Sequence, residues 1–228
     1  MKQIKKFDIT LLFDVEPTII IIGRRETGKS VLVCDILDHY TKTQDLTDIS
    51  FMEDLLPTEV INDIIKFLPK NGTVITRTTK REMYQQYTHI YDEYQPSIIE
   101  NIVKSNQNSF LVLDNCLYDM SWTRDTFMRN IFGNGSIMMI FTLDYPIGIP
   151  IKMREKIDYI FLLREKYIQN RKCIWEIYGG IFPSFELFCS ILDDCTKNNY
   201  CLVIKNNCEE SCDLFDRIFT YRAELKTV

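Results

Sequence analysis

The sequence predicts an α/β fold in which helices cover both faces of a largely parallel central sheet. Short apolar runs alternate along the 228-residue chain with longer segments of helical character. Two of these runs, residues 18–22 and 137–141, are almost wholly apolar, as is typical of strands buried on both faces of a sheet. Regular alternation of such strands with helices indicates a parallel sheet with crossover helices.

The predicted strands follow the apolar runs, and the predicted helices lie between them. We expect strands over residues 18–22, 72–76, 110–113, 137–141, 159–163 and 201–204. We expect helices over residues 29–40, 59–68, 80–93, 97–105, 123–131 and 185–195. No repeat or Gly/Ser/Pro-rich linker divides the chain. We therefore expect a single domain over residues 1–228, with about residues 165–228 completing the sheet or forming a small appendage.

Composition and charge exclude several classes of protein. Hydrophobic residues make up 46% of the chain, which is enough for a sizeable core and argues against disorder. Its apolar runs are too short to span a bilayer. The N-terminal residues lack the apolar segment of a secretion signal, so we expect an intracellular protein. The net charge of −5 disfavours a protein that covers nucleic acid with its whole surface, but it allows contact through local patches.

The eight cysteines do not form a metal-binding pattern. They include no C-x-x-C pair, and the chain has only two histidines. A structural zinc site is the alternative that these spacings disfavour. We expect reduced, mostly buried thiols.

Residues 23–30 read GRRETGKS, which matches the Walker A pattern G-x-x-x-x-G-K-S. A predicted strand leads into this segment and a predicted helix begins at Lys29, as a phosphate-binding loop requires. Backbone N–H groups of such a loop point at phosphate oxygens, the lysine reaches the β- and γ-phosphates, and the hydroxyl of Ser30 binds Mg²⁺. We therefore predict a P-loop NTPase that uses ATP and Mg²⁺. The predicted nucleotide-binding residues are Gly23, Arg24, Arg25, Glu26, Thr27, Gly28, Lys29, Ser30 and Val31.

A carboxylate at the end of a second buried strand completes the predicted metal site. Asp114 follows the apolar run 110–113, which places it at the carboxyl edge of the sheet, where ligands bind. We expect it to hold Mg²⁺ through water; the alternative is an ordinary strand-end carboxylate. Asn115 comes next, and a neutral amide can orient a water molecule but cannot accept its proton.

Longer motifs resemble one family. The segments are LDNCLYD at 113–119 with SWT at 121–123, TLDYPIGIP at 142–150 leading through Arg154 to DYIF at 158–161, GIFPSF at 180–185, and CLVI at 201–204. They resemble the poxvirus-type DNA-packaging ATPases of nucleocytoplasmic large DNA viruses, a branch of the FtsK–HerA superfamily. The resemblance covers residues 13–224, and the chain is similar to a divergent member.

The resemblance implies an ATP-hydrolysing DNA translocase that packages viral genomic DNA into the capsid. The implied partners are double-stranded DNA, further copies of the chain in a homo-oligomeric ring, and capsid or portal-vertex proteins. The implied location is the viral factory in the host cytoplasm, and also the virion. By the same resemblance, Asp114 is the Walker B acid and Arg154 stabilises transition-state charge, in a neighbouring subunit's site as one option. The alternative for Arg154 is a solvated side chain beside Lys152 and Lys156.

The sequence departs from the family at three places. Asn115 stands where the family has a second acid, Asp144 stands where it has a glutamine, and residues 133–136 replace a basic turn. In this class of ATPase, the resemblance implies that the strand ending at Asp144 lies between the strand that leads into the phosphate loop and the strand that ends at Asp114, so that positions 115 and 144 face the same phosphate. Our hypothesis is that the two groups are exchanged: Asp144 is the general base, and Asn115 senses the phosphate.

Other features have an ordinary structural interpretation beside a functional one. Two basic clusters either line a DNA channel or are solvated loops: Arg77, Lys80 and Arg81, and Arg164, Lys166, Arg171 and Lys172, the second with Glu165 inside it. Four tyrosines at helical spacing, Tyr84, Tyr87, Tyr91 and Tyr94, predict a helix face packed on the core. Two further functions remain open, a degenerate ATP-binding paralogue with a structural or regulatory role in virion assembly and a P-loop kinase of small molecules.

Overall fold

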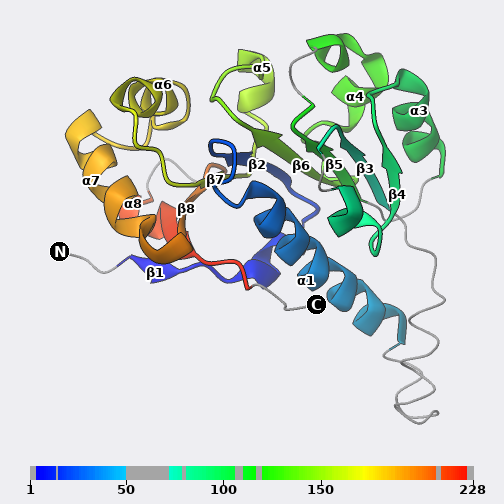
Figure 1. The fold of residues 1–228 in the computed structure, drawn as a ribbon, viewed down its shortest axis with the longest axis horizontal. Coiled ribbons are helices and arrows are strands. Elements are labelled where there is room, and N and C mark those ends of the chain that lie inside the picture. Colours follow the sequence, from blue (N-terminus) through cyan, green and yellow to red (C-terminus); the bar gives the residue numbers. More distant parts are fainter. Residues whose placement is uncertain are drawn as a thin grey trace.

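The computed structural model describes residues 4–13, 15–49, 72–78, 81–105, 110–116, 120–208 and 212–224. Within these ranges one sheet holds nine strands in the order β1-β9-β8-β7-β2-β6-β5-β3-β4 (Figure 1). The strands are β1 Lys5–Lys6, β2 Thr18–Ile22, β3 Gly72–Thr76, β4 His89–Tyr91, β5 Phe110–Asp114, β6 Met138–Leu143, β7 Tyr159–Leu162, β8 Cys201–Lys205 and β9 Ile218–Tyr221.

The sheet is largely parallel, as predicted. From β4 across to β7 every neighbouring pair runs parallel. β8 runs antiparallel to both β7 and β9, and β1 lies parallel to β9 at the edge. The carboxyl ends of β2, β5 and β6 therefore meet at one edge, and the antiparallel pair brings the start of β8 and the end of β9 to the same edge.

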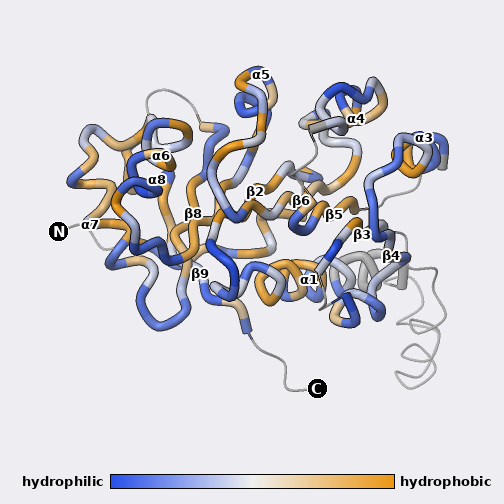
Figure 2. Tube along the Cα trace, turned by 45° about the horizontal axis from the view of Figure 1, so that its top comes forward, coloured by the Kyte–Doolittle hydropathy of each residue, from blue (hydrophilic) through white to orange (hydrophobic). Residues whose placement is uncertain are grey.

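Helices cover both faces of the sheet, which confirms the predicted layers. They are α1 Lys29–Ile49, α3 Pro96–Ser105, α4 Thr126–Ile131, α5 Ile151–Arg154, α6 Ile168–Tyr178, α7 Phe185–Cys195 and α8 Leu214–Arg217, with 3-10 turns η1 Ile9–Leu12, η2 Arg81–Tyr84, η3 Met120–Arg124 and η4 Lys197–Asn199. α1 lies below the sheet in Figure 2, and α3, α4, α5 and α6 lie above it. No helix in the described part of the chain is long and apolar enough to cross a membrane.

Period-two alternation within each strand feeds the two cores. In β2, Ile20 and Ile22 pack into the core under α3 to α7, whereas Ile19 and Ile21 pack into the core under α1. Successive side chains of a strand point to opposite faces. Because helices cover both faces of this sheet, all four side chains are buried. Figure 2 shows the resulting hydrophobic colour along the central strands.

Most predicted elements occur where the sequence placed them, and one is wrong. The predicted strands and α7 are present, and α1 is longer than predicted, whereas residues 59–68 lie outside the described residues. The predicted helix over residues 80–93 is instead η2, a turn and the edge strand β4. The run Thr88-His89-Ile90-Tyr91 is rich in strand-forming residues, and pairing with the exposed edge of β3 satisfies its backbone. The helix expected over residues 123–131 begins only at Thr126, where the Asp125 side chain caps it.

Candidate functional site

The loop between β2 and α1 has a backbone conformation that requires glycine at two positions. A Cβ atom on Gly23 would lie 2.6 Å from the Thr27 hydroxyl and 2.8 Å from Cβ of Leu163, so a larger residue does not fit. Gly28 has a φ of 101°, a conformation that side chains strongly disfavour. The Thr27 hydroxyl donates a hydrogen bond of 2.6 Å to the Arg24 carbonyl and closes the loop. The residues of the sequence motif therefore form a preorganised loop at the start of α1.

Lys29 is folded back over this loop. Its side chain is only 8% exposed, and its Nζ donates to the carbonyl oxygens of Gly23 at 2.6 Å and Arg24 at 3.0 Å. The third contact is an ion pair of 2.6 Å with Oδ1 of Asp144. A lysine ammonium has three donors, and all three are engaged, one of them by a carboxylate that sequence reasoning did not pair with Lys29.

Asp114 lies at the end of β5 inside a set of hydroxyl groups. It is 1% exposed, and Oδ1 accepts a hydrogen bond of 2.6 Å from Thr142. Oδ2 accepts hydrogen bonds of 2.8 Å from Tyr84 and 3.3 Å from Ser30. The register explains this meeting, because Asp114 stands opposite Thr142 of β6 and Thr76 of β3. Mg²⁺ prefers hard oxygen ligands such as the Asp114 carboxylate and the Ser30 hydroxyl, so the residues present fit this metal.

Tyr84 is a site residue that sequence reasoning missed. It ends η2 and is fully buried, with its hydroxyl on Asp114. Burial and the neighbouring Asp114 raise the pKa of Tyr84 above its usual range, so the hydroxyl stays protonated and donates. The tyrosine spacing predicts a helix face packed on the core. The burial of Tyr84 and Tyr87 agrees with core packing, but the segment does not form one continuous helix and Tyr91 is exposed.

Asn115 and Asp144 line one cavity, as the predicted strand order requires. β6 lies between β2 and β5, and the cavity of about 410 Å³ also borders Arg25 and Tyr145. Asn115 has a φ of 56°, and its backbone N–H donates to the Thr142 hydroxyl at 2.9 Å. Asp144 is 18% exposed and also pairs with Nε of Arg25 at 3.4 Å. The carboxylate is therefore compensated by two cations within the chain.

Arg154 makes contacts within the chain but keeps part of its surface exposed. It ends α5 and is partly buried. Its Nε donates a hydrogen bond of 2.7 Å to the Ile149 carbonyl, and its guanidinium carbon lies 5.9 Å from the centre of the Tyr178 ring. These contacts place the side chain against α6, on the opposite face of the sheet from α1.

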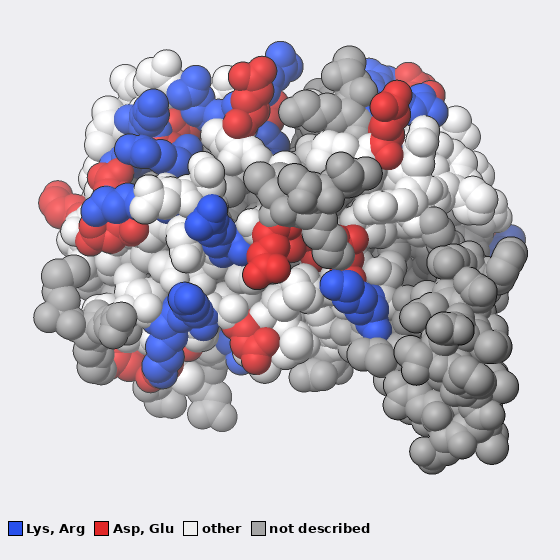
Figure 3. All heavy atoms as spheres, turned by 60° about the horizontal axis from the view of Figure 1, so that its bottom comes forward, with Lys and Arg blue, Asp and Glu red and all other residues white. Residues whose placement is uncertain are grey.

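The two basic clusters consist in large part of paired charges. Arg77 bonds Glu93 at 2.5 Å and Arg81 bonds Asp92 at 2.6 Å; Lys80 lies outside the described residues. Arg171 makes two hydrogen bonds to Asp193, at 2.8 and 2.6 Å. Figure 3 shows acidic and basic side chains interspersed on the face that it presents.

Within the second cluster Glu165 has a structural role. It is 4% exposed and accepts hydrogen bonds from the backbone N–H groups of Lys166 and Tyr167 at the start of α6.

The thiols are free, but the expectation that most are buried is wrong in degree: Cys116, Cys195 and Cys201 are buried, Cys212 is exposed, and the other four are partly exposed.

The chain is similar to proteins of large DNA viruses and to solved packaging enzymes, although no protein-family model matches it. An uncharacterized protein of Acanthamoeba polyphaga mimivirus, L437, is 26% identical, covering 97% of this chain and 77% of that protein. Uncharacterized protein 088R of Invertebrate iridescent virus 3 is also 26% identical, covering 90% and 75%.

Solved structures with the same fold are genome packaging NTPases. B204 of Sulfolobus turreted icosahedral virus 2 in complex with AMPPCP aligns with a TM-score of 0.54 at 11% identity, over 91% of this chain and 98% of that one. B204, the DNA-packaging ATPase of Sulfolobus turreted icosahedral virus, aligns with a TM-score of 0.55 at 14% identity, over 92% and 98%. The chain therefore has a P-loop NTPase fold, the fold of viral genome packaging NTPases.

Proposed function

We propose that the chain is the ATP-hydrolysing motor subunit that drives DNA into a viral capsid. The observation that carries this proposal is the grouping of Lys29, Ser30 and Asp114 at the carboxyl edge of the sheet, in a fold shared with genome packaging NTPases. The matched fold covers nearly the whole length of those NTPases. Double-stranded DNA, a homo-oligomeric ring and capsid or portal-vertex proteins are the proposed partners, and the host cytoplasm, in the viral factory, is the proposed location.

The nucleotide is bound by the loop residues 23–31 in this proposal. Their N–H groups and the start of α1 hold the phosphates, and Lys29 turns from Asp144 to the β- and γ-phosphates. Ser30 and, through water, Asp114 would hold Mg²⁺, which neutralises charge on the transferring phosphoryl group. Tyr84 and Thr142 fix the Asp114 carboxylate from two sides.

Asp144 and Asn115 act on the attacking water and the γ-phosphate. Once Lys29 has moved to the phosphate, Asp144 keeps only the exposed Arg25 as a cationic partner, and its carboxylate can orient a water molecule and accept its proton. Asn115 offers an amide N–H₂ to a phosphate oxygen from the other side of the same cavity. Arg154 is only partly buried, and we propose that it acts toward a neighbouring subunit.

Two observations favour a second candidate function. The triphosphate-binding lysine is held by an internal carboxylate, and the position after Asp114 carries an amide instead of an acid. A protein with these features binds ATP but hydrolyses it slowly, which suits a structural or regulatory part in virion assembly. The kinase alternative has no such support.

The decisive experiment is ATP turnover measured with and without double-stranded DNA, with Lys29→Ala as the inactive control. The motor predicts hydrolysis that DNA stimulates and that the substitution abolishes. ATP binding without turnover under both conditions would leave the regulatory paralogue as the better function. Phosphoryl transfer to a small acceptor without DNA would instead indicate the kinase.

A further inference from the structure

Arg154 is anchored at two points, while part of its charged group is left available. Its Nε donates a hydrogen bond of 2.7 Å to the Ile149 carbonyl, and its guanidinium carbon lies 5.9 Å from the centre of the Tyr178 ring. Within the described residues, neither of its terminal nitrogens has a hydrogen-bond partner. A guanidinium with such nitrogens binds phosphate oxygens in a bidentate geometry. The side chain is therefore held in place and still able to bind an anion.

Arg154 lies away from the phosphate site of its own chain. The Asn206 side chain donates hydrogen bonds to the carbonyl oxygens of Arg154 at 3.5 Å and Ile157 at 2.9 Å. Asn206 follows β8, whose end pairs with the start of β7, so α5 ends near the amino edge of the sheet, whereas the phosphate loop lies at the carboxyl edge. The described residues that line the cavity with Asn115 and Asp144 do not include Arg154. This placement favours a phosphate bound to a neighbouring subunit over one bound to the same chain.

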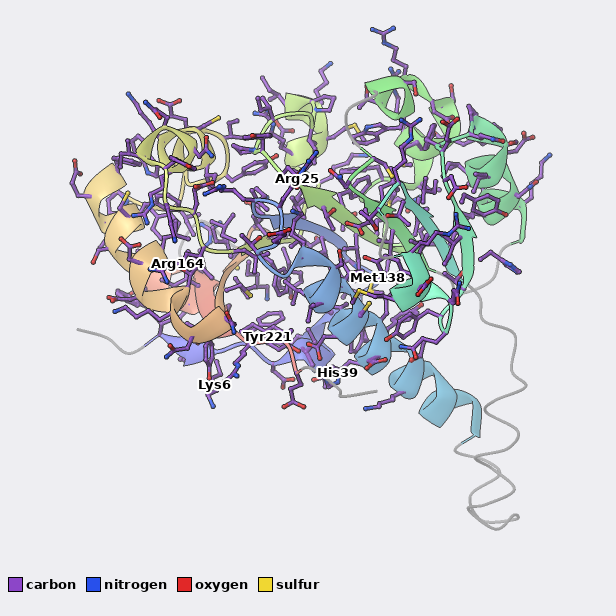
Figure 4. All side chains as sticks on the ribbon, viewed as in Figure 1. Lys6, Arg25, His39, Met138, Arg164 and Tyr221 are labelled. Atoms are coloured by element: carbon purple, nitrogen blue, oxygen red, sulfur yellow. The ribbon has the colours of Figure 1, made fainter. Side chains whose placement is uncertain are left out.

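Tyr178 is fixed by the packing of α6. It is the last residue of this helix, is 6% exposed, and belongs to the core under α3 to α7. The Glu165 carboxylate accepts hydrogen bonds from the backbone at the start of α6, and two side-chain hydrogen bonds join α6 to α7. In Figure 4, Arg164 marks the segment that leads into α6, and Arg25 marks the phosphate loop. The Tyr178 ring is thus presented to α5 by a helix that is tied down at several points.

We propose that Tyr178 is a positioning residue for Arg154, an inference that rests on the proposed function. The separation of 5.9 Å lies within the reach of a cation–π contact, about 6 Å. The ring holds the guanidinium in the orientation in which its terminal nitrogens face a phosphate of the neighbouring subunit. Without the ring, Arg154 keeps only the hydrogen bond to Ile149 and can turn about it. A cation that is already oriented loses less conformational freedom when it binds the transition state.

The ring of Tyr178 carries this role, and its hydroxyl does not. The hydroxyl is buried and has no hydrogen-bond partner among the described residues. Burial raises the pKa of Tyr178 to about 12, so the hydroxyl is neutral at physiological pH and forms no ion pair with Arg154. Phenylalanine at this position should therefore keep the function, and removing an unsatisfied hydroxyl should not lower stability.

The test measures kcat and KM for ATP hydrolysis by the assembled ring in the presence of double-stranded DNA. Tyr178→Leu removes the ring and should lower kcat about tenfold, the size expected for one partly buried cation–π contact, and leave KM unchanged. Tyr178→Phe should keep the parental kcat. In an Arg154→Ala background, Tyr178→Leu should lower kcat no further, because no guanidinium is left to position.

Phe182→Leu is the matched control for the loss of a buried ring. Phe182 is 3% exposed, belongs to the same core and packs on Phe188, so its replacement should lower stability but not kcat. If Tyr178→Leu does not fold, Tyr178→Met fills more of the space without a ring and takes its place. A parental kcat in the variant without the ring, or an equal loss of kcat in Phe182→Leu, would refute the positioning role.

Mixed rings separate an effect on the neighbour from damage within the chain. Rings that mix Tyr178→Leu with Lys29→Ala subunits should turn over faster per intact phosphate loop than Tyr178→Leu rings, because the Lys29→Ala subunits supply a correctly held Arg154. No gain would mean that Tyr178 acts only within its own chain, and the inference would fail. If it fails while the parent shows turnover that DNA stimulates and Lys29→Ala abolishes, the proposed function stands. A parent without turnover would overturn both.

Discussion

Replacing Asp144 by asparagine separates two effects of this carboxylate, the observed ion pair with Lys29 and the proposed role as a general base. Oδ1 of Asp144 lies 2.6 Å from Nζ of Lys29, and both side chains are largely buried. ATP must take Lys29 from this partner before the lysine can bind phosphate. The carboxylate also faces the cavity shared with Asn115, where the proposed mechanism needs a proton acceptor.

The contact geometry sets the size of both effects. A hydrogen bond between charged groups contributes about 1.5–3 kcal/mol net, so removing the charge of Asp144 should tighten ATP binding roughly 10- to 100-fold. Loss of a general base should lower turnover by about two to four powers of ten. Sequence reasoning alone treats Asp144 only as a base and predicts an unchanged affinity, so the affinity measurement tests what the ion pair adds.

The assay combines equilibrium binding of a fluorescent ATP analogue with steady-state turnover. Asp92→Asn is the control, because Asp92 is an exposed carboxylate paired with Arg81 away from the loop and should alter neither quantity. The double variant Asn115→Asp with Asp144→Asn should regain part of the turnover. An unchanged ATP affinity in Asp144→Asn would show that the carboxylate does not compete with phosphate, and an unchanged turnover would show that it is not the base.

Three further outcomes follow from other contacts of the site. Tyr84→Phe removes the hydroxyl that bonds Asp114 and should raise the Mg²⁺ concentration for half-maximal nucleotide binding several-fold with the fold retained by circular dichroism; an unchanged Mg²⁺ requirement would contradict this. Rings that mix Arg154→Ala with Lys29→Ala subunits should regain ATPase activity, and no recovery in well-mixed rings would contradict action in trans. Burial and Asp114 raise the pKa of Cys116 to about 12, so iodoacetamide at pH 8 should label this thiol only after unfolding; labelling of the native protein would argue against its burial.

The parts of the fold predicted from sequence are those that local patterns encode. An apolar strand followed by GRRETGKS defines the phosphate loop, and the apolar run that ends at Asp114 places this carboxylate at the same edge, because parallel strands end together. The position of β6 between β2 and β5 came from the family resemblance, and the strand order confirms it. These features depend on residues that are close in sequence or on a topology that many proteins share.

The missed features depend on contacts between distant segments. Tyr84 reaches Asp114 only because η2 returns to the sheet after β3, and no local spacing reveals that return. Asp35 contacts Tyr221, 186 residues away, through an antiparallel extension of the sheet whose last strand, β9, was not predicted. Tertiary packing overrides local periodicity in both cases, just as edge pairing with β3 replaced the predicted helix by β4.

The exchange of acid and amide couples two events that would otherwise be separate. Lys29 cannot bind phosphate and also keep all of its contacts, because Gly23, Arg24 and Asp144 engage all three of its donors. In the proposed mechanism, binding of a triphosphate releases Asp144 from Lys29 in the same movement that engages the lysine, and Arg25 remains as its cationic partner. A nucleoside diphosphate offers Lys29 only a β-phosphate, and we expect the ion pair with Asp144 to persist in its complex.

This coupling predicts how ADP and ATP differ in their response to Asp144→Asn. Since only ATP has to break the ion pair, the substitution should tighten ATP binding roughly 10-fold or more and change ADP binding much less. Titration of parent and variant with both nucleotides gives the two ratios directly. Equal tightening of ADP and ATP would mean that the β-phosphate already displaces Asp144, and the base would then be free in both nucleotide states.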